Sequence, residues 1–188
     1  AYDAMSGGAA TSQKAANADA FSHSSANLPF SRELDFKVGN GFFRRLWVSA
    51  PASTRSADGL GPLFNARSCQ RCHLKDGRGH PPEAGERNAT SMFLRLSIPP
   101  QTDAQKKLLA DLRAPVIAEP TYGTQLQDFA VQGIDPEGRM HITYTEQPVT
   151  LDDGTVVSLR RPTYKITDLA YGPLHPQAML SPRVATPM

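Results

Sequence analysis

Apolar residues recur at helical spacing in the segment from Ser31 to Trp47. Residues three or four positions apart lie on one face of an α-helix, so this spacing predicts an amphipathic helix. Arg44 and Arg45 fall near its end, where positive charge interacts favourably with the helix dipole. The positions that define the apolar face are Leu34, Val38, Phe42, Leu46 and Trp47.

No such period precedes this helix. Residues 1–30 are rich in Ala, Ser, Gly and Asn, a composition that buries little apolar surface. We therefore expect an N-terminal arm over residues 1–30, extended on the surface or partly disordered. One domain is expected over residues 31–188.

The next regular pattern begins at Met92. Residues 92–98 have the partly alternating apolar character of a strand, which Pro99 and Pro100 end. Thr102 followed by Gln105 forms a capping box, in which each side chain can satisfy a free backbone N–H at the start of a helix. A short helix is therefore predicted directly after Thr102.

From Pro115 onward the composition is typical of β-structure. Residues 139–145 read as one strand, and residues 149–151 and 155–160 read as a hairpin around the turn Asp152-Asp153-Gly154. We expect a β-rich extension from about residue 92. The predicted class is α+β with much irregular structure, in which a short helical segment precedes this extension.

The composition agrees with short elements joined by long loops. The chain has 188 residues, of which 16 are Pro and 14 are Gly. Its hydrophobic content of 39% is low for a compact core, which a buried cofactor could supplement. The net charge of +2 is spread along the chain, so no basic stripe indicates nucleic acid, and no apolar run is long enough to span a membrane.

The candidate chemistry lies in Cys69-Gln70-Arg71-Cys72-His73. Two cysteines three apart, followed directly by histidine, form the attachment sequence for c-type haem. Cys69 and Cys72 can each form a thioether to the porphyrin, and His73 can then bind the iron as the proximal ligand. We therefore expect one covalently attached haem c, bound by a cytochrome c-like helical haem segment that precedes the β-rich extension.

Two other uses of the cysteine pair fit less well. A structural zinc site needs four ligands, and the remaining histidines show no paired spacing that would complete one. A thioredoxin-like pair would follow a strand and begin a helix within a βαβ unit, whereas the preceding Gly59-Leu60-Gly61-Pro62 is a turn.

The haem surroundings can be assigned in part. Phe64 is the natural ring to pack against the porphyrin, and Met92 is the preferred second iron ligand, with His80 as the alternative. More remote choices for this ligand are Met140 and His141. The turn at residues 76–79 and the two prolines after His80 limit the haem-binding helix to one or two turns.

The run Gly59-Leu60-Gly61-Pro62-Leu63-Phe64-Asn65-Ala66-Arg67-Ser68-Cys69, continued by Cys72-His73 and Asp76-Gly77-Arg78-Gly79, resembles the first haem segment of the bacterial di-haem oxidoreductases. This family is also called thiol-oxidoreductase-like and is related to the di-haem cytochrome c peroxidases. Further matching pieces are Leu94-Arg95-Leu96-Ser97, Tyr122-Gly123, Gln125-Leu126-Gln127, residues 159–164, residues 171–174 and residues 181–185.

The resemblance implies a fragment of a longer protein with a second haem domain. On that basis we expect an electron-transfer domain whose partner is the second haem domain or a separate redox protein. The alternative is a peroxidase-type haem with an open distal side, at which His80 and Arg78 would assist. Covalent attachment of this kind takes place outside the bacterial cytoplasm, so the expected location is the periplasm.

Overall fold

The computed structural model describes residues 4–83 and 90–188, and its contacts divide them into two compact units. Unit 1 contains the chain up to Met92 together with residues 184–188, and unit 2 contains residues 93–183. Unit 2 begins close to residue 92, from which the β-rich extension is expected, and the division into an N-terminal arm and one haem domain stays a prediction. Residues 184–188, in contrast, group with unit 1, although unit 2 separates them from it in the sequence.

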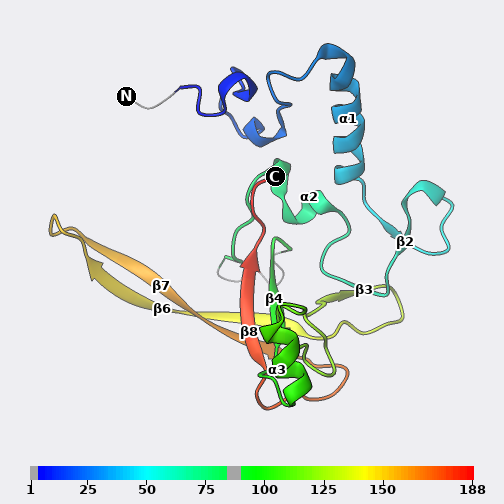
Figure 1. The fold of residues 1–188 in the computed structure, drawn as a ribbon, viewed down its shortest axis with the longest axis vertical. Helices are drawn as coiled ribbons and strands as arrows, with labels where there is room; N and C mark the ends of the chain where they lie inside the picture. Colours follow the sequence, from blue (N-terminus) through cyan, green and yellow to red (C-terminus); the bar gives the residue numbers. More distant parts are fainter. Residues whose placement is uncertain (1–3, 84–89) are drawn as a thin grey trace. The chain divides into compact units, whose positions relative to one another are not determined.

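Unit 1 has one long helix and otherwise short elements (Figure 1). The helix α1 spans Phe30–Arg44, close to the predicted segment, and Glu33 in its first turn and Arg44 in its last complement the helix dipole. Strand β1 pairs in parallel with β2. The other elements of unit 1 are η1 (Gly8–Ala10), η2 (Ala20–Ser22), β1 (Val48–Ser49), η3 (Arg55–Ala57), β2 (Asp58–Leu60), β3 (Leu63–Phe64), α2 (Cys69–Cys72) and η4 (Leu74–Asp76).

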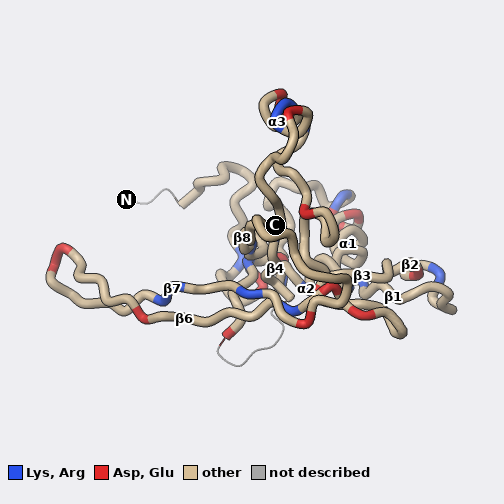
Figure 2. The backbone as a smooth tube through the Cα atoms, turned by 90° about the horizontal axis from the view of Figure 1, so that it is seen from below, with Lys and Arg blue, Asp and Glu red and all other residues tan. Residues whose placement is uncertain are grey.

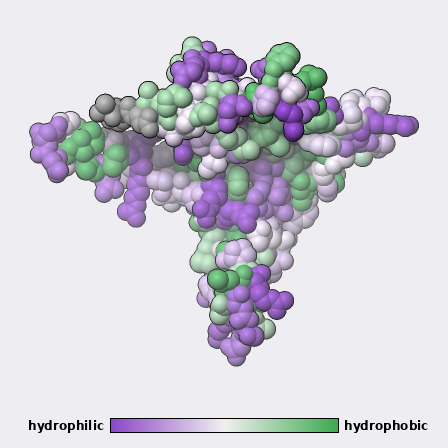
Figure 3. All heavy atoms as spheres, turned by 45° about the horizontal axis from the view of Figure 1, so that its top comes forward, coloured by the Kyte–Doolittle hydropathy of each residue, from purple (hydrophilic) through white to green (hydrophobic). Residues whose placement is uncertain are grey.

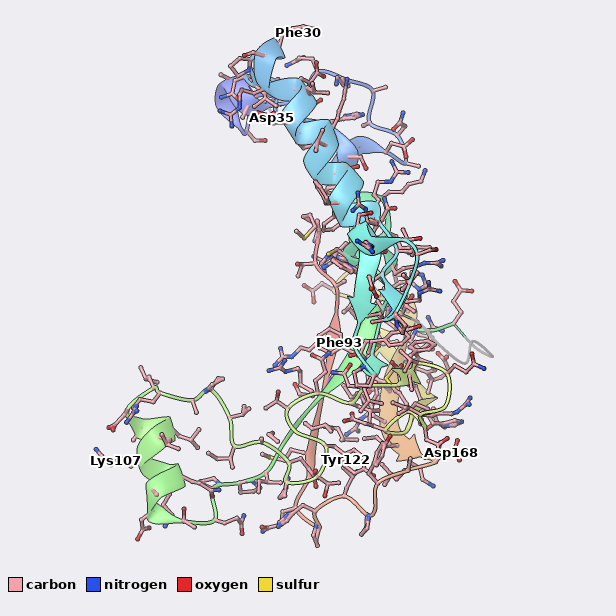
Figure 4. The ribbon with its side chains drawn as sticks, turned by 90° about the vertical axis from the view of Figure 1, so that its right-hand side faces the viewer. Phe30, Asp35, Phe93, Lys107, Tyr122 and Asp168 are labelled. Atoms are coloured by element: carbon pink, nitrogen blue, oxygen red, sulfur yellow. The ribbon has the colours of Figure 1, made fainter. Side chains whose placement is uncertain are left out.

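Unit 2 is built around two pairs of strands. Strand β4 (Met92–Ser97) pairs with β8 (Met179–Val184), and the two run side by side in Figure 1. The helix α3 (Asp103–Ala110) begins as predicted, because the Thr102 hydroxyl accepts the N–H of Gln105 at 3.2 Å. It carries Lys107 and stands apart from these strands in Figures 2 and 4. The short β5 spans Phe129–Ala130.

The second pair is an antiparallel hairpin. Strands β6 (Arg139–Thr150) and β7 (Val156–Thr167) have 12 residues each and stay in register throughout. The separate strands expected over residues 139–145 and 149–151 are therefore one continuous strand. Pairing with β7 carries the chain through Glu146, Gln147 and Pro148 because cross-strand hydrogen bonds outweigh weak local β-propensity.

The core of unit 2 consists of buried apolar residues from several elements. Leu94 and Leu96 of β4 pack with Ile166 of β7, because alternate residues of a strand share a face. The remaining members, Tyr122 and Leu126, come from the connection after α3. Several family-like pieces of the sequence, around residues 94, 122 and 126, therefore meet in one core.

Two buried carboxylates accompany this core. Glu119 accepts the backbone N–H groups of Thr121, Tyr122 and His175 at 2.7–2.8 Å. Burial alone would raise the pKa of Glu119, but these donors and nearby His175 lower it overall. Burial raises the pKa of Glu137, and the charge of Glu119 adds to that effect although the N–H of Gln127 opposes it.

The mixed α+β class with much irregular structure is confirmed. The cytochrome c-like character of the helical part stays a prediction, because around the cysteine motif the structure shows only the single turn α2 followed by η4. None of the helices in residues 4–83 and 90–188 has the length and apolar content that a membrane span requires. Acidic and basic residues are interspersed along most elements (Figure 2).

Candidate functional site

The cysteine motif forms a single helical turn, α2, whose start is fixed locally. The Ser68 hydroxyl caps α2 by accepting the N–H of Arg71 at 3.3 Å. Before it, Arg67 and Trp47 exchange two hydrogen bonds, from Trp47 N to the Arg67 carbonyl at 2.7 Å and from Arg67 Nε to the Trp47 carbonyl at 3.0 Å. These bonds hold the entry to the motif against the chain that leaves α1.

His73 ends this turn, and a main-chain acceptor orients its ring. The Nδ1 atom of His73 lies 2.6 Å from the carbonyl oxygen of Thr186. A carbonyl can only accept, so Nδ1 carries a proton, and in the neutral ring Nε2 then keeps a free lone pair. The ring of Phe43 lies 6.0 Å away, centroid to centroid, at 51°. His73 is thus held in the tautomer that a metal-binding Nε2 requires.

The chain reverses directly after His73. Lys75 and Asp76 have left-handed backbone conformations, with φ of 52° and 63°, which non-glycine residues seldom adopt. The side chain of Asp76 is buried and accepts from Asn40 Nδ2 at 3.1 Å and from the hydroxyl of Ser22. This carboxylate therefore connects the residues after His73 with α1 and η2.

The N-terminal segment also contacts this turn. Lys75 Nζ lies 2.8 Å from a carboxylate oxygen of Asp19, and this partner lowers the pKa of Asp19 through a hydrogen bond and its charge. The Ser22 hydroxyl also donates to the carbonyl of Lys75 at 3.0 Å. The part of the expected arm around residues 19–22 is therefore bound to the motif.

The two cysteines are available for covalent chemistry. Neither forms a disulfide, Cys69 is exposed, and Cys72 is half-buried with its thiol 2.9 Å from the carbonyl of Thr90. Together with the imidazole of His73, the thiols of Cys69 and Cys72 fit the attachment of a c-type haem. Among residues 4–83 and 90–188, no group of three or more His, Cys, Asp or Glu side chains is arranged to hold a metal ion.

The apolar surface of unit 1 also fits a porphyrin. Within its described residues, the buried hydrophobic residues are Ala57, Met92 and Ala185, and α1 contributes none. Phe30 of α1 is 89% exposed and Leu34 is 68% exposed (Figure 4). Hydrophobic residues likewise lie among hydrophilic ones on the face in Figure 3. A bound porphyrin would give unit 1 apolar surface to pack against. The other large apolar residues exposed in unit 1 are Met5, Phe21, Phe36, Val38, Phe42, Leu46, Trp47, Leu74 and Met188.

The structure places the two residues that were predicted to surround the haem, Phe64 and Met92, in different elements. Phe64 lies in β3, five positions before Cys69, and is half-buried. Met92 is 3% exposed and shares a face of β4 with Leu94 and Leu96, an environment that packing explains. Its role as second iron ligand stays a prediction.

The alternative distal residues lie in different surroundings. His80 and Arg78 are exposed in unit 1, and His80 Nδ1 lies 2.9 Å from the carbonyl of Pro81, which again leaves Nε2 unprotonated. Met140 and His141 belong to β6 of unit 2, where Met140 packs against the core and His141 faces solvent. Packing therefore accounts for Met140.

Sequence reasoning missed the residues that position His73. Thr186 is 113 positions away, and Asn40 and Ser22 precede Asp76 by 36 and 54 positions. One local sign was available, because Asp directly before Gly77 indicates a tight turn in which Asp tolerates a positive φ. Nothing in the local sequence marks Thr186 as an acceptor.

Comparison with known protein families identifies the family of this chain. The model of a family described as "Di-haem oxidoreductase, putative peroxidase" matches residues 2–178. No curated protein and no solved structure matched the chain.

Proposed function

Because the chain belongs to the di-haem oxidoreductase family, we propose that unit 1 holds one covalently attached haem c and transfers electrons. Family membership supports haem binding and oxidoreductase chemistry. The finer assignment, one haem attached at Cys69 and Cys72 with His73 as its iron ligand, is supported by the residues themselves.

The hydrogen bond between His73 and Thr186 carries the proposal. Metal-binding histidines usually donate the N–H of their other ring nitrogen to a carbonyl or carboxylate, which fixes the ring and increases its basicity. His73 makes this contact at 2.6 Å.

The roles of the three residues follow from their chemistry. The thiols of Cys69 and Cys72 would each add across one vinyl group, forming a C–S bond while the thiol hydrogen goes to the other vinyl carbon. His73 would donate its Nε2 lone pair to the iron. The bound group supplies a one-electron couple, and the protein adjusts it through the axial ligands, burial and hydrogen bonds. Cytochrome c-like packing of α1 and α2 around the group is part of the proposal.

The proposed partners are a second haem domain of the same protein or a separate redox protein, since the family is di-haem. The proposed location is the periplasm, because c-type haem is attached outside the bacterial cytoplasm.

The test is to produce the full chain in a bacterium that has a c-type haem maturation system. The expected product carries the mass of one haem, keeps its colour after acid–acetone extraction and shows a c-type spectrum. Replacing both cysteines, Cys69→Ala with Cys72→Ala, should abolish the added mass. Replacing Arg71→Ala between the two cysteines, where the side chain is exposed, is the matched control and should retain it. A bare polypeptide mass in the unchanged protein would overturn the proposal.

His80 favours a second candidate, a peroxidase-type site. Its unprotonated Nε2 could accept a proton from hydrogen peroxide, and the guanidinium of Arg78 could stabilise developing negative charge. The two candidates differ in turnover. Peroxide reduction by the isolated chain at about 1 to 1000 per second, lost in His80→Gln, would favour catalysis. Reversible one-electron reduction without peroxide turnover would favour electron transfer.

A further inference from the structure

The acceptor of His73 lies in a short segment that three main-chain hydrogen bonds hold against the region around the motif. The N–H of Gly79 donates to the Ala185 carbonyl at 2.9 Å, and the N–H of Ala185 donates to the Ser91 carbonyl at 3.0 Å. Two residues beyond Thr186, the N–H of Met188 donates to the Asp76 carbonyl at 2.8 Å. Residues 185–188 therefore form a strap that is held on both sides of Thr186.

Asp76 holds one end of this strap through its main chain and is itself fixed through its side chain. The residue is 6% exposed, and its carboxylate accepts from Asn40 of α1 and Ser22 of η2 on different oxygens. Asp76 has a left-handed backbone conformation, with φ of 63°. The two hydrogen bonds of its side chain stabilise this conformation. One residue thus joins α1, η2 and the strap.

We propose that Asp76 is the positioning residue of the proximal histidine. Its carboxylate fixes the turn after His73, and its carbonyl fixes the strap, so that the Thr186 carbonyl meets Nδ1 of His73. The inference deepens the proposed function, since the fixed tautomer leaves Nε2 for the iron. The hydrogen bonds that define the arrangement join residues of the chain itself, so a folded haem-free chain tests it directly, and the haem-loaded chain decides it where the haem-free chain does not fold.

The first measurement is the tautomer of His73 in the haem-free chain, from ¹⁵N NMR of histidine-labelled protein at about pH 8.5, where imidazole is neutral. A His73→Ala sample identifies the signals of this residue among the five histidines. In the unchanged protein we expect the proton on Nδ1. Loss of one hydrogen bond of ordinary strength should lower the ratio of the Nδ1–H to the Nε2–H tautomer by roughly 5- to 10-fold.

Two pairs of variants separate positioning from general stability. Met188→Pro removes the N–H that binds the Asp76 carbonyl and should lower the ratio, whereas Met188→Ala keeps that N–H and should not. Asp76→Gly removes the carboxylate and should lower the ratio. Asp76→Asn should retain it, because Asn also tolerates a positive φ and the Ser22 hydroxyl can accept from an amide. Asp19→Asn, which breaks only the exposed pair with Lys75, is the charge control.

The second measurement uses the haem-loaded chain. The reduction potential should be higher in Met188→Pro than in Met188→Ala, because an imidazole without its carbonyl acceptor is a weaker donor to ferric iron. Unchanged tautomer ratios in Met188→Pro and in a folded Asp76→Gly would overturn the inference, and Met188→Pro alone decides it if Asp76→Gly does not fold. Failure to attach haem would contradict the proposed function but leave the tautomer result standing.

Discussion

His73 Nδ1 and the carbonyl oxygen of Thr186 are 2.6 Å apart, although 113 positions separate them in the sequence. The contact closes a long loop around all of unit 2, so its formation requires that residues 184–188 return to unit 1. The geometry of the haem motif therefore depends on the fold of the whole chain, and several consequences can be measured.

Glu119 should be intolerant of a neutral isostere. Both of its carboxylate oxygens accept backbone N–H groups, Oε1 from His175 and Oε2 from Thr121 and Tyr122. In Glu119→Gln, the amide NH₂ would face one of these donors, so the free energy of unfolding should fall by about 1 to 3 kcal/mol at pH 7. Urea denaturation measures this loss. A change below about 0.5 kcal/mol would contradict the assigned hydrogen bonds.

Replacement of Glu137 by glutamine should increase the free energy of unfolding, in contrast to Glu119→Gln. Burial raises its pKa above the ordinary value of 4.5, so its ionised form is disfavoured in the folded state at neutral pH. Glu137→Gln removes that cost, and the amide oxygen can still accept the N–H of Gln127. We expect stability at pH 7 to increase by about 1 kcal/mol or less, with little change at pH below 4.

The lowered pKa of Glu119 also predicts a pH dependence of the stability. The pKa of Glu119 is lower in the folded than in the unfolded chain, so its contribution to stability is complete above about pH 4.5 and is lost as the pH falls through its folded pKa. The curve of unfolding free energy against pH should therefore lose part of its acid-side slope in Glu119→Gln. Denaturation between about pH 3 and 7 would show it, and parallel curves for the two proteins would refute it.

Gly79 should not accept a side chain. A Cβ at this position would lie 2.5 Å from Cβ and 2.8 Å from the carbonyl oxygen of Ser91, closer than atoms can approach without displacement. Gly79→Ala should cost about 1 to 3 kcal/mol and weaken the hydrogen bond to Ala185. Gly61→Ala is the control, because its Cβ would meet nothing nearer than 3.7 Å. Equal stability of the two variants would contradict the close approach.

Met92 should be tested as an iron ligand with a substitution of similar volume. Because the side chain is 3% exposed, Met92→Ala should destabilise the chain by about 2 to 5 kcal/mol whether or not the sulfur binds iron. Met92→Leu preserves most of the packing and removes the sulfur. If Met92 is the second ligand, this variant loses the sulfur–iron absorption band and changes its reduction potential. An unchanged spectrum would exclude Met92 and leave His80, or an open distal side without a second ligand, as the alternatives.

Local spacing was enough to predict several elements. The period of Leu34, Val38 and Phe42 predicted α1 because a helix repeats its faces every three or four residues. Thr102 and Gln105 marked the start of α3, and the turn at Asp152–Gly154 marked the hairpin, because caps and turns depend on adjacent residues. Cys69, Cys72 and His73 form their motif within five positions, so this motif could also be identified from the sequence.

The hydrogen bonds between segments far apart in the sequence could be found only in the tertiary structure. Nothing near Thr186 indicates that its carbonyl orients His73, because every main-chain carbonyl is an equivalent acceptor until folding brings one within reach. The sequence could mark a turn at Asp76 but not its partners Ser22 and Asn40, since the pairing depends on how η2 and α1 pack in unit 1. The sequence by itself identified Cys69, Cys72 and His73 as the candidates for haem binding. The fold decided which residues orient them, because those residues lie far away in the sequence.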